Sequence, residues 1–150
     1  MRITVNIAEF GQGMQAAKAE FADRVFRAVA LSCAEIEGAA KERCPKGNGE
    51  DGETVPLRQS ISFWVESADG KAKGTVGSPL EHAVFVHEGT GLYSRTGMGR
   101  KDVPWTYRNS KGDFYSTKGI ESHPFLEEAV DEKRERVLQI FRVIVGGETP

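Results

Sequence analysis

Apolar residues recur every three or four positions through two long segments of this chain. The first segment runs from residue 14 to residue 43, contains no proline, and is followed closely by Pro45. The second covers residues 124–145, where acidic residues come early and arginines late, an order that suits the helix dipole. Spacing of this kind is typical of amphipathic helices. We therefore predict two long helices, over 14–43 and over 124–145.

Between the two helices, apolar and polar residues alternate in the manner of strands. The sequence SISFWVES at 60–67 alternates, Asp69 and Gly70 supply a turn, and AKGTVG at 72–77 returns. A second pair, VPWTYR and DFYST, flanks the turn sequence NSKG. The first ten residues, MRITVNIAEF, alternate as well and predict a further short strand.

A short helix is predicted near 79–88, between the two hairpins. Ser78 is placed to cap it, Glu81 to complete a capping box, and Pro79 suits the first helical position. The order of elements predicts an α+β fold, in which an antiparallel sheet of about four to five strands is packed by the two long helices. The expected core consists of Phe21, Val25, Val29, Phe63, Leu126, Val130 and Val137.

Composition and charge are those of an ordinary soluble globular chain. Its 150 residues favour a single domain over 1–150, and its content of 39% apolar and 28% charged residues is typical of folded proteins. The formal net charge of −2 gives no overall attraction to nucleic acid. The sequence shows neither a membrane-spanning apolar run nor the apolar region of a signal peptide, so we expect folding in a cytoplasm.

The two cysteines, Cys33 and Cys44, lie 11 residues apart in or just after the first helix. On one continuous helix this separation is about 16 Å, whereas a disulfide needs Cα atoms within about 7 Å. We therefore expect two free thiols that are buried or partly buried. Two cysteines without further ligands nearby also make no zinc site.

The segment EHAVFVHEGTGLYSRTGMGRKD, residues 81–102, raises the question of a metal or phosphate site. A zinc-binding helix needs two histidines four residues apart, whereas His82 and His87 are five apart and would point about 140° away from each other. The glycines match no phosphate-binding motif. We predict a structural corner, in which Gly89 ends the short helix. A hydrolase that uses His87 and Glu88 is kept as an alternative.

Positive charge gathers between residues 89 and 118, although the chain as a whole is net negative. This segment holds six basic and two acidic residues, interleaved with aromatic residues such as Tyr107. Basic and aromatic side chains together can bind single strands, so a small nucleic-acid-binding protein that uses the hairpin 95–118 is the main alternative function. The glycine-rich stretch 91–102 is expected to become ordered on a partner. The residues expected to contact a partner or DNA are Arg95, Arg100 and Lys101.

Three segments of the chain together resemble one protein family. CPKGNGEDGETVPLRQSISFWV at 44–65 resembles the segment after that family's first helix, with a Leu-Arg-x-Ser-Ile stretch that leads into a strand. That stretch is filled here by Leu57, Arg58, Ser60 and Ile61. VGSPLEHAVFVHEGTG at 76–91 resembles its short helix, and VPWTYRNSKGDFYSTKGIESHPFLEEAV at 103–130 resembles its tryptophan-containing hairpin and last helix start. The family is that of tailed-bacteriophage (siphophage) neck proteins, of the head–tail joining or tail-completion (minor tail component) type.

This resemblance implies a structural virion protein and no enzyme, with no catalytic, metal-binding or cofactor-binding residues. It implies a ring, expected to have six copies, in the neck of a phage or prophage, where it joins head to tail or completes the tail. The implied partners are further copies, neighbouring neck, connector and tail-tube proteins, and DNA that passes through the lumen, without membrane contact. Tail terminator, tail-completion protein and head-side connector all remain open.

The implied location is the virion and, during assembly, the host bacterial cytoplasm. At the end of the short helix we expect a structural corner in which Arg58 and Glu88 are partners. Its members are Arg58, Glu88, Gly89 and Thr90.

Overall fold

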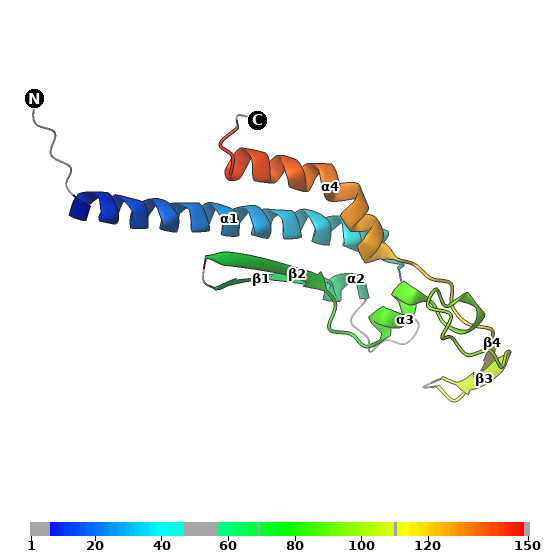
Figure 1. The fold of residues 1–150 in the computed structure, drawn as a ribbon. Coiled ribbons are helices and arrows are strands. Elements are labelled where there is room, and N and C mark those ends of the chain that lie inside the picture. Colours follow the sequence, from blue (N-terminus) through cyan, green and yellow to red (C-terminus); the bar gives the residue numbers. More distant parts are fainter. Residues whose placement is uncertain (1–6, 47–56, 69, 110, 149–150) are drawn as a thin grey trace, which may run out of the picture. The chain divides into compact units, whose positions relative to one another are not determined.

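A computed structural model describes residues 7–46, 57–68, 70–109 and 111–148 of the chain (Figure 1). Two long helices flank a series of short helices and strands, which makes the protein α+β. The elements in chain order are α1 (Ile7–Arg43), α2 (Leu57–Ser60), β1 (Ser62–Ala68), β2 (Lys71–Gly77), α3 (His82–Glu88), the 3₁₀ turn η1 (Gly91–Tyr93), β3 (Trp105–Arg108), β4 (Phe114–Thr117) and α4 (Phe125–Ile144).

The strands form two separate two-stranded sheets, β1 with β2 and β3 with β4. The expectation of one antiparallel sheet of four to five strands is therefore wrong, although the α+β class is correct. Within the second sheet the strands are antiparallel, with Tyr107 opposite Tyr115. Alternation of apolar and polar residues specifies pairing across a short turn, but it does not specify which hairpins join edge to edge.

The N-terminal strand predicted from MRITVNIAEF is also wrong where the structure describes that segment. Ile7 to Phe10 form the first turns of α1, and residues 1–6 lie outside the described residues. The sequence that follows is rich in alanine, and each residue added to an existing helix gains a hydrogen bond. The helix therefore extends back to Ile7, into the segment whose short alternation of apolar and polar residues predicted a strand. The last helix, α4, agrees with the predicted 124–145 within one residue at each end.

The predicted capping box of the short helix is wrong as well. Helix α3 begins at His82, and its N-cap residue Glu81 makes no side-chain capping hydrogen bond. Ser78 instead accepts a hydrogen bond on Oγ from Leu80 N at 3.1 Å, and its hydroxyl lies 2.6 Å from Ser60 Oγ. These contacts fix the turn that precedes α3.

The chain forms two compact units, each of which contains part of α1 and part of α4. The first unit comprises residues 1–35, 63–75 and 134–150. Within it, Gly74 of β2 lies directly against α1, because a Cβ atom there would overlap Cys33 Sγ and stand 2.9 Å from Val29 Cγ1. Arg136 Nε of α4 donates to Glu35 Oε1 of α1 at 3.2 Å. Helix α1 thus contacts both β2 and α4 in this unit.

The second unit comprises residues 36–62 and 76–133 and holds the main apolar cluster. The Phe125 ring, only 1% exposed, lies among small side chains of α1 and α4, which leave room for it. Arg43 Nη2 forms an ion pair with Glu132 Oε2 at 2.6 Å and ties the end of α1 to α4. The buried members of the cluster are Ala39, Ala40, Cys44, Leu57, Ile61, Phe125 and Ala129.

The core prediction is wrong in detail, because none of the seven expected residues is fully buried. Phe21 is 56% exposed and Val130 is 46% exposed, while the other five are partly buried. Periodicity identifies the apolar face of a helix, but not which part of that face another element covers. On α1 the covered part carries small residues such as Ala28 and Ala39, whereas Phe21 lies on the exposed part.

Both cysteines are free and buried, as expected, with one in each unit. Burial raises the pKa of the Cys33 thiol, and burial likewise raises the pKa of Cys44 against the opposing charge of Arg58. Since the thiolate is the reactive form, both thiols should resist alkylation until the surrounding unit opens.

We propose that the two units unfold together as one domain, because α1 and α4 pass through both. In Cys33→Ala and Cys44→Ala variants, the single remaining thiol should become reactive at the same denaturant concentration. Thiol labelling along a urea series measures this. Exposure of one thiol at clearly lower urea would instead reveal two independent domains.

Candidate functional site

The glycine-rich loop that follows α3 is hydrogen-bonded to the segment that precedes α4. Thr90 N donates to Ile120 O at 2.9 Å, and Ile120 N donates to Thr90 Oγ1 at 3.0 Å. Leu92 N donates to Lys118 O at 3.0 Å. The loop therefore donates main-chain hydrogen bonds to a segment far away in the sequence, and the Thr90 hydroxyl accepts one in return.

Glycines make this close backbone approach possible. At Gly91, with φ of 59°, a Cβ atom would overlap the carbonyl of Lys118. At Gly119, with φ of 125°, it would overlap the carbonyl of Thr90. Both residues occupy the positive φ region that other residues rarely adopt. Gly91 and Gly119 thus serve close packing, a use that the expectation of a partner-ordered loop did not include.

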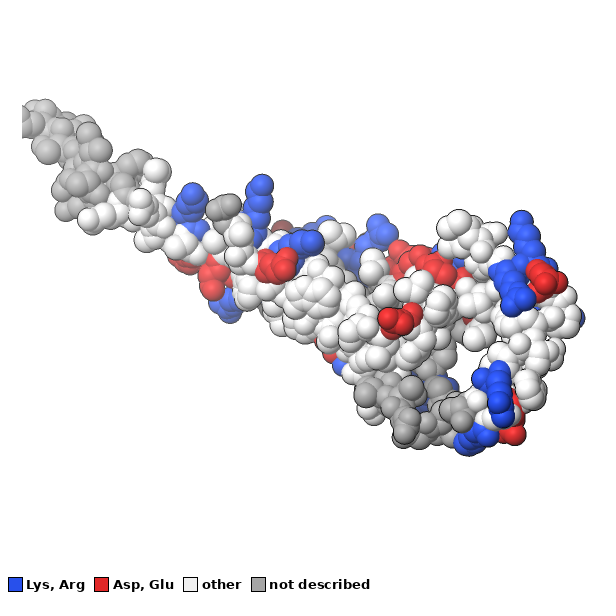
Figure 2. Space-filling model, turned by 90° about the horizontal axis from the view of Figure 1, so that it is seen from below, with Lys and Arg blue, Asp and Glu red and all other residues white. Residues whose placement is uncertain are grey.

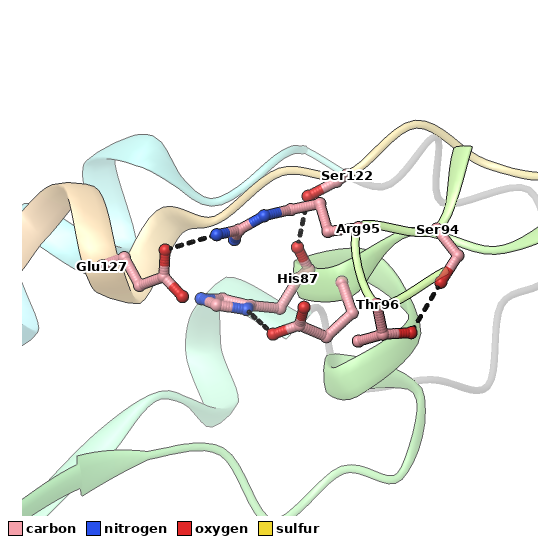
Figure 3. Close-up of polar contacts among 7 residues, drawn as sticks. His87, Ser94, Arg95, Thr96, Ser122 and Glu127 are labelled. Carbon is pink, nitrogen blue, oxygen red and sulfur yellow. Dashed lines mark hydrogen bonds and ion pairs between the residues drawn. The ribbon is translucent and has the colours of Figure 1, made fainter. Parts of the chain in front are cut away.

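A cluster of polar side chains ties the loop to α3 and α4 (Figure 3). Arg95 Nη2 donates to Glu127 Oε2 at 2.7 Å, and Arg95 N donates to the Glu88 carbonyl at 2.9 Å. His87 Nδ1 lies 2.9 Å from Glu88 Oε1, and Ser122 Oγ donates to the His87 carbonyl at 2.7 Å. We call His87, Glu88, Arg95, Ser122 and Glu127 the corner cluster.

The Arg95–Glu127 pair is the electrostatic centre of the corner cluster. The hydrogen bond from Arg95 lowers the pKa of the Glu127 carboxyl, and the nearby His87 charge acts in the same direction. The hydrogen bond to Glu127 raises the pKa of Arg95 in turn. Because the folded state favours ionised Glu127, the pair stabilises the fold above the ordinary carboxyl pKa, and this stabilisation is lost as pH falls through the lowered pKa.

The lowered pKa of Glu127 predicts how the stability of a Glu127→Gln variant depends on pH. At about pH 7 the variant should unfold at lower urea than the wild type, and at an acidic pH below the lowered pKa the difference should shrink because Glu127 is then protonated in both states. An exposed glutamate in the same segment, changed in Glu121→Gln, is the matched control and should show little effect at either pH. A urea midpoint difference that stays constant with pH would contradict the pairing.

The corner cluster contains three groups with metal-ligand chemistry, which the sequence did not bring together. His87, Glu88 and Glu127 each place one ligand atom within 4.8 Å of the others. Arg95 already supplies positive charge to Glu127, however. His82 does not belong to this group in the described part of the chain.

The same geometry bears on the hydrolase alternative at His87 and Glu88. His87 Nδ1 is hydrogen-bonded to Glu88, while Nε2 is buried and has no hydrogen-bond partner among the described residues. The ring packs edge-on against Phe125, with centroids 5.3 Å apart. A general base must reach the proton that it removes; here Nδ1 of the imidazole is held by Glu88, while the ring lines a pocket between α3 and the start of α4.

The remaining corner residues are placed as follows. Gly89 ends α3 with φ of 74°, as predicted for a helix stop. Thr90 accepts from Ile120 through its hydroxyl. Arg58 Nη2 donates to the Glu42 carbonyl at 3.1 Å, so Arg58 and Glu88 are not partners in the described part of the chain.

The basic and aromatic residues beyond the loop lie on the β3–β4 hairpin and beside it. Tyr107 and Tyr115 stack with ring centroids 5.8 Å apart, and both remain about half exposed. Arg108 lies over Phe114 at 5.6 Å and Arg100 lies over Trp105 at 5.5 Å. Lys101 is exposed. Figure 2 shows that, on the face it presents, basic side chains lie in small groups near acidic ones and not in one stripe.

An apolar pocket opens beside the corner cluster, entirely within the second unit. Its volume is about 430 Å³. Val84 and Phe85 of α3 and Met98 of the loop line it, and they are 61%, 56% and 88% exposed. Glu88 and Trp105 also line the pocket. Exposed apolar side chains gathered in this way mark a contact surface.

Sequence reasoning missed Glu127 and this pocket. Glu127 follows Arg95 by 32 residues, and no local spacing signals such a pair. A signal for the pocket did exist, because HAVFVHE places four consecutive apolar residues on a short helix, and one helix face cannot bury them all.

The fold and the site define a protein whose loops are fastened together by polar contacts and whose exposed features are apolar and aromatic contact surfaces. No helix in the described ranges is both long enough and apolar enough to cross a bilayer.

The particular family follows from comparison with known proteins. The family described as "Bacteriophage HK97-gp10, putative tail-component" matches residues 8–89, more than half of the chain. The protein therefore belongs to the HK97-gp10-like family of phage tail components, which are structural proteins of the virion. The predicted resemblance is thereby confirmed, while the resembling segment at 103–130 lies outside the match. No curated protein and no solved structure matches the chain.

Proposed function

We propose that the protein is a ring-forming subunit in the neck or tail of a tailed phage or prophage, where it joins head to tail or completes the tail. Its membership of a family of phage tail components carries the proposal. The ring is proposed to hold six copies. A closed ring of identical subunits needs two different contact surfaces on every subunit.

The exposed apolar side chains support this proposal. Met14 and Phe21 are 60% and 56% exposed in the first unit, and Phe85 and Met98 are 56% and 88% exposed in the second. Monomeric soluble proteins rarely leave large contiguous apolar patches open to water. The proposed partners are further copies of this chain and the neighbouring connector and tail-tube proteins, with assembly in the host cytoplasm.

Deletion of the gene tests the proposed role in assembly. Lysates of the deleted phage should contain heads and tails that accumulate without joining, or tails of abnormal length, and the wild-type chain supplied in trans should restore infectious particles. Electron microscopy of the lysates distinguishes these products. Normal particles in the absence of the chain would contradict the proposal.

A contact with DNA that passes through the ring is a second candidate. The exposed Tyr107–Tyr115 stack, flanked by Arg108, is the observation that favours it, because aromatic and basic side chains together bind single strands. Binding of the purified chain to DNA should then weaken steeply with salt, and a Tyr107→Ala, Arg108→Ser variant should bind more weakly still. Equal binding by the wild type and this variant would rule out the hairpin as the DNA contact.

A further inference from the structure

The N-terminal half of α1 carries an apolar stripe that the described residues of its own unit leave open. Met14 is 60% exposed and Phe21 is 56% exposed, and with the partly buried Val25 they fall within an arc of about 40° on the helix. The same arc continues to Ser32 and Ala39, which are 6% and 2% exposed. One helix face is therefore buried within the chain toward its C-terminal end and uncovered toward its N-terminal end.

The charges of this helix half lie away from the stripe and pair with one another. Glu20 forms an ion pair with Arg24, and Asp23 forms one with Arg27. Lys18 stands at the border of the stripe, one turn before Phe21. A partner for the stripe therefore has an apolar surface with a nearby acid, which is not the chemistry of nucleic acid.

The pocket of the second unit has this chemistry. Its exposed lining of Val84, Phe85 and Met98 is apolar, and Glu88 supplies an acid beside Arg100, which also lines the pocket. The volume of about 430 Å³ accommodates a phenylalanine ring together with a neighbouring aliphatic side chain. Large aromatic residues seated in pockets are the usual anchors of protein interfaces.

We propose that the α1 stripe of one copy, with Phe21 as its anchor, docks into this pocket on the next copy. This inference rests on the proposed ring, and it names the two surfaces that build it. The stripe and the pocket are different surfaces of the same chain, so each contact leaves one stripe and one pocket open. Such head-to-tail contacts continue from copy to copy until they close into a ring. Lys18 of the docking copy is then placed to meet Glu88 of its neighbour.

Two variants, each with one surface disabled, test the contact. Phe21→Asp places a charge on the stripe, and Val84→Asp places one in the pocket. Both positions are exposed, so the fold is expected to survive, which circular dichroism checks. Light scattering should show each variant as a monomer, with self-association weakened at least about a hundredfold. An equimolar mixture should form a 1:1 dimer and nothing larger, because one intact stripe meets one intact pocket and the other two surfaces are blocked.

Ala19→Asp is the matched control. It adds the same charge to the same helix, about 160° away from Phe21, and should assemble as the wild type does. Phe21→Asp assemblies of wild-type size would overturn the inference and leave the ring standing. Two monomeric variants that do not dimerise on mixing would show that stripe and pocket do not meet. A wild-type chain that stays monomeric would contradict the ring itself, and this contact with it.

Discussion

Replacement of Phe125 by alanine is expected to lower the free energy of unfolding by about 3–5 kcal/mol. The Phe125 ring is 1% exposed and lies in the cluster formed by α1, α2 and the start of α4. Its loss removes apolar burial and leaves a cavity that small neighbours such as Ala39 and Ala129 cannot fill. It also removes the edge contact to His87 beneath the corner cluster. Urea unfolding followed by circular dichroism measures the change.

Phe114→Ala is the matched control for this prediction. Phe114 is 74% exposed on β4, so the same substitution there should cost less than about 1 kcal/mol. Equal costs at the two positions would mean that the cluster around Phe125 is not the core of the second unit.

Gly119→Ala is expected to lower the free energy of unfolding by about 2–4 kcal/mol and to release the loop that follows α3. Two effects add at this position. The φ of 125° is strained for alanine, and its Cβ would overlap the carbonyl of Thr90, which is backbone and cannot rotate away. Hydrogen exchange at Thr90 and Leu92, whose amides donate to the carbonyls of Ile120 and Lys118, reports the release directly.

Gly97→Ala separates the two effects. Gly97 also has a positive φ, 68°, but a Cβ atom there meets nothing within 4 Å. Strain alone should cost about 1 kcal/mol at this position and leave exchange at Thr90 unchanged. If Gly119→Ala is no worse than Gly97→Ala, the close backbone packing of the loop is refuted.

The long helices were predictable because each carries its own signal. The helical spacing of α4 is complete within its twenty residues, and its ends fell within one residue of the prediction. The arrangement of the strands was not predictable in the same way. Pairing of β1 with β2 depends on a local turn, whereas joining β2 to β3 would depend on contacts between segments that no sequence period encodes.

The buried core residues could not be predicted from periodicity for a related reason. Phe21 and Ala39 lie on the same face of α1, yet one is exposed and the other buried. The sequence pattern identifies that face, but the covering elements come from other parts of the chain or from another copy. The large residues of the exposed half are then explained by the proposed contact between copies, and the small residues of the buried half by the ring of Phe125.

In the candidate site, too, features that depend on local sequence were predictable and features that join distant residues were not. Gly89 as a helix stop was predictable, because the requirement is local. The pairing of Arg95 with Glu127 was not, because it joins a loop to a helix 32 residues further on. Arg95 pairs with Glu127 and keeps 40% of its side chain exposed, so the expected partner contacts of Arg95, Arg100 and Lys101 all stay predictions.

The copy number of the chain in purified virions tests the central claim most directly. Quantitative mass spectrometry against the other tail proteins should find the chain in intact particles, at a fixed copy number that is a multiple of six, as the proposed ring of six copies requires. Absence of the chain from infectious particles, or a variable trace amount, would contradict its role as a structural ring subunit.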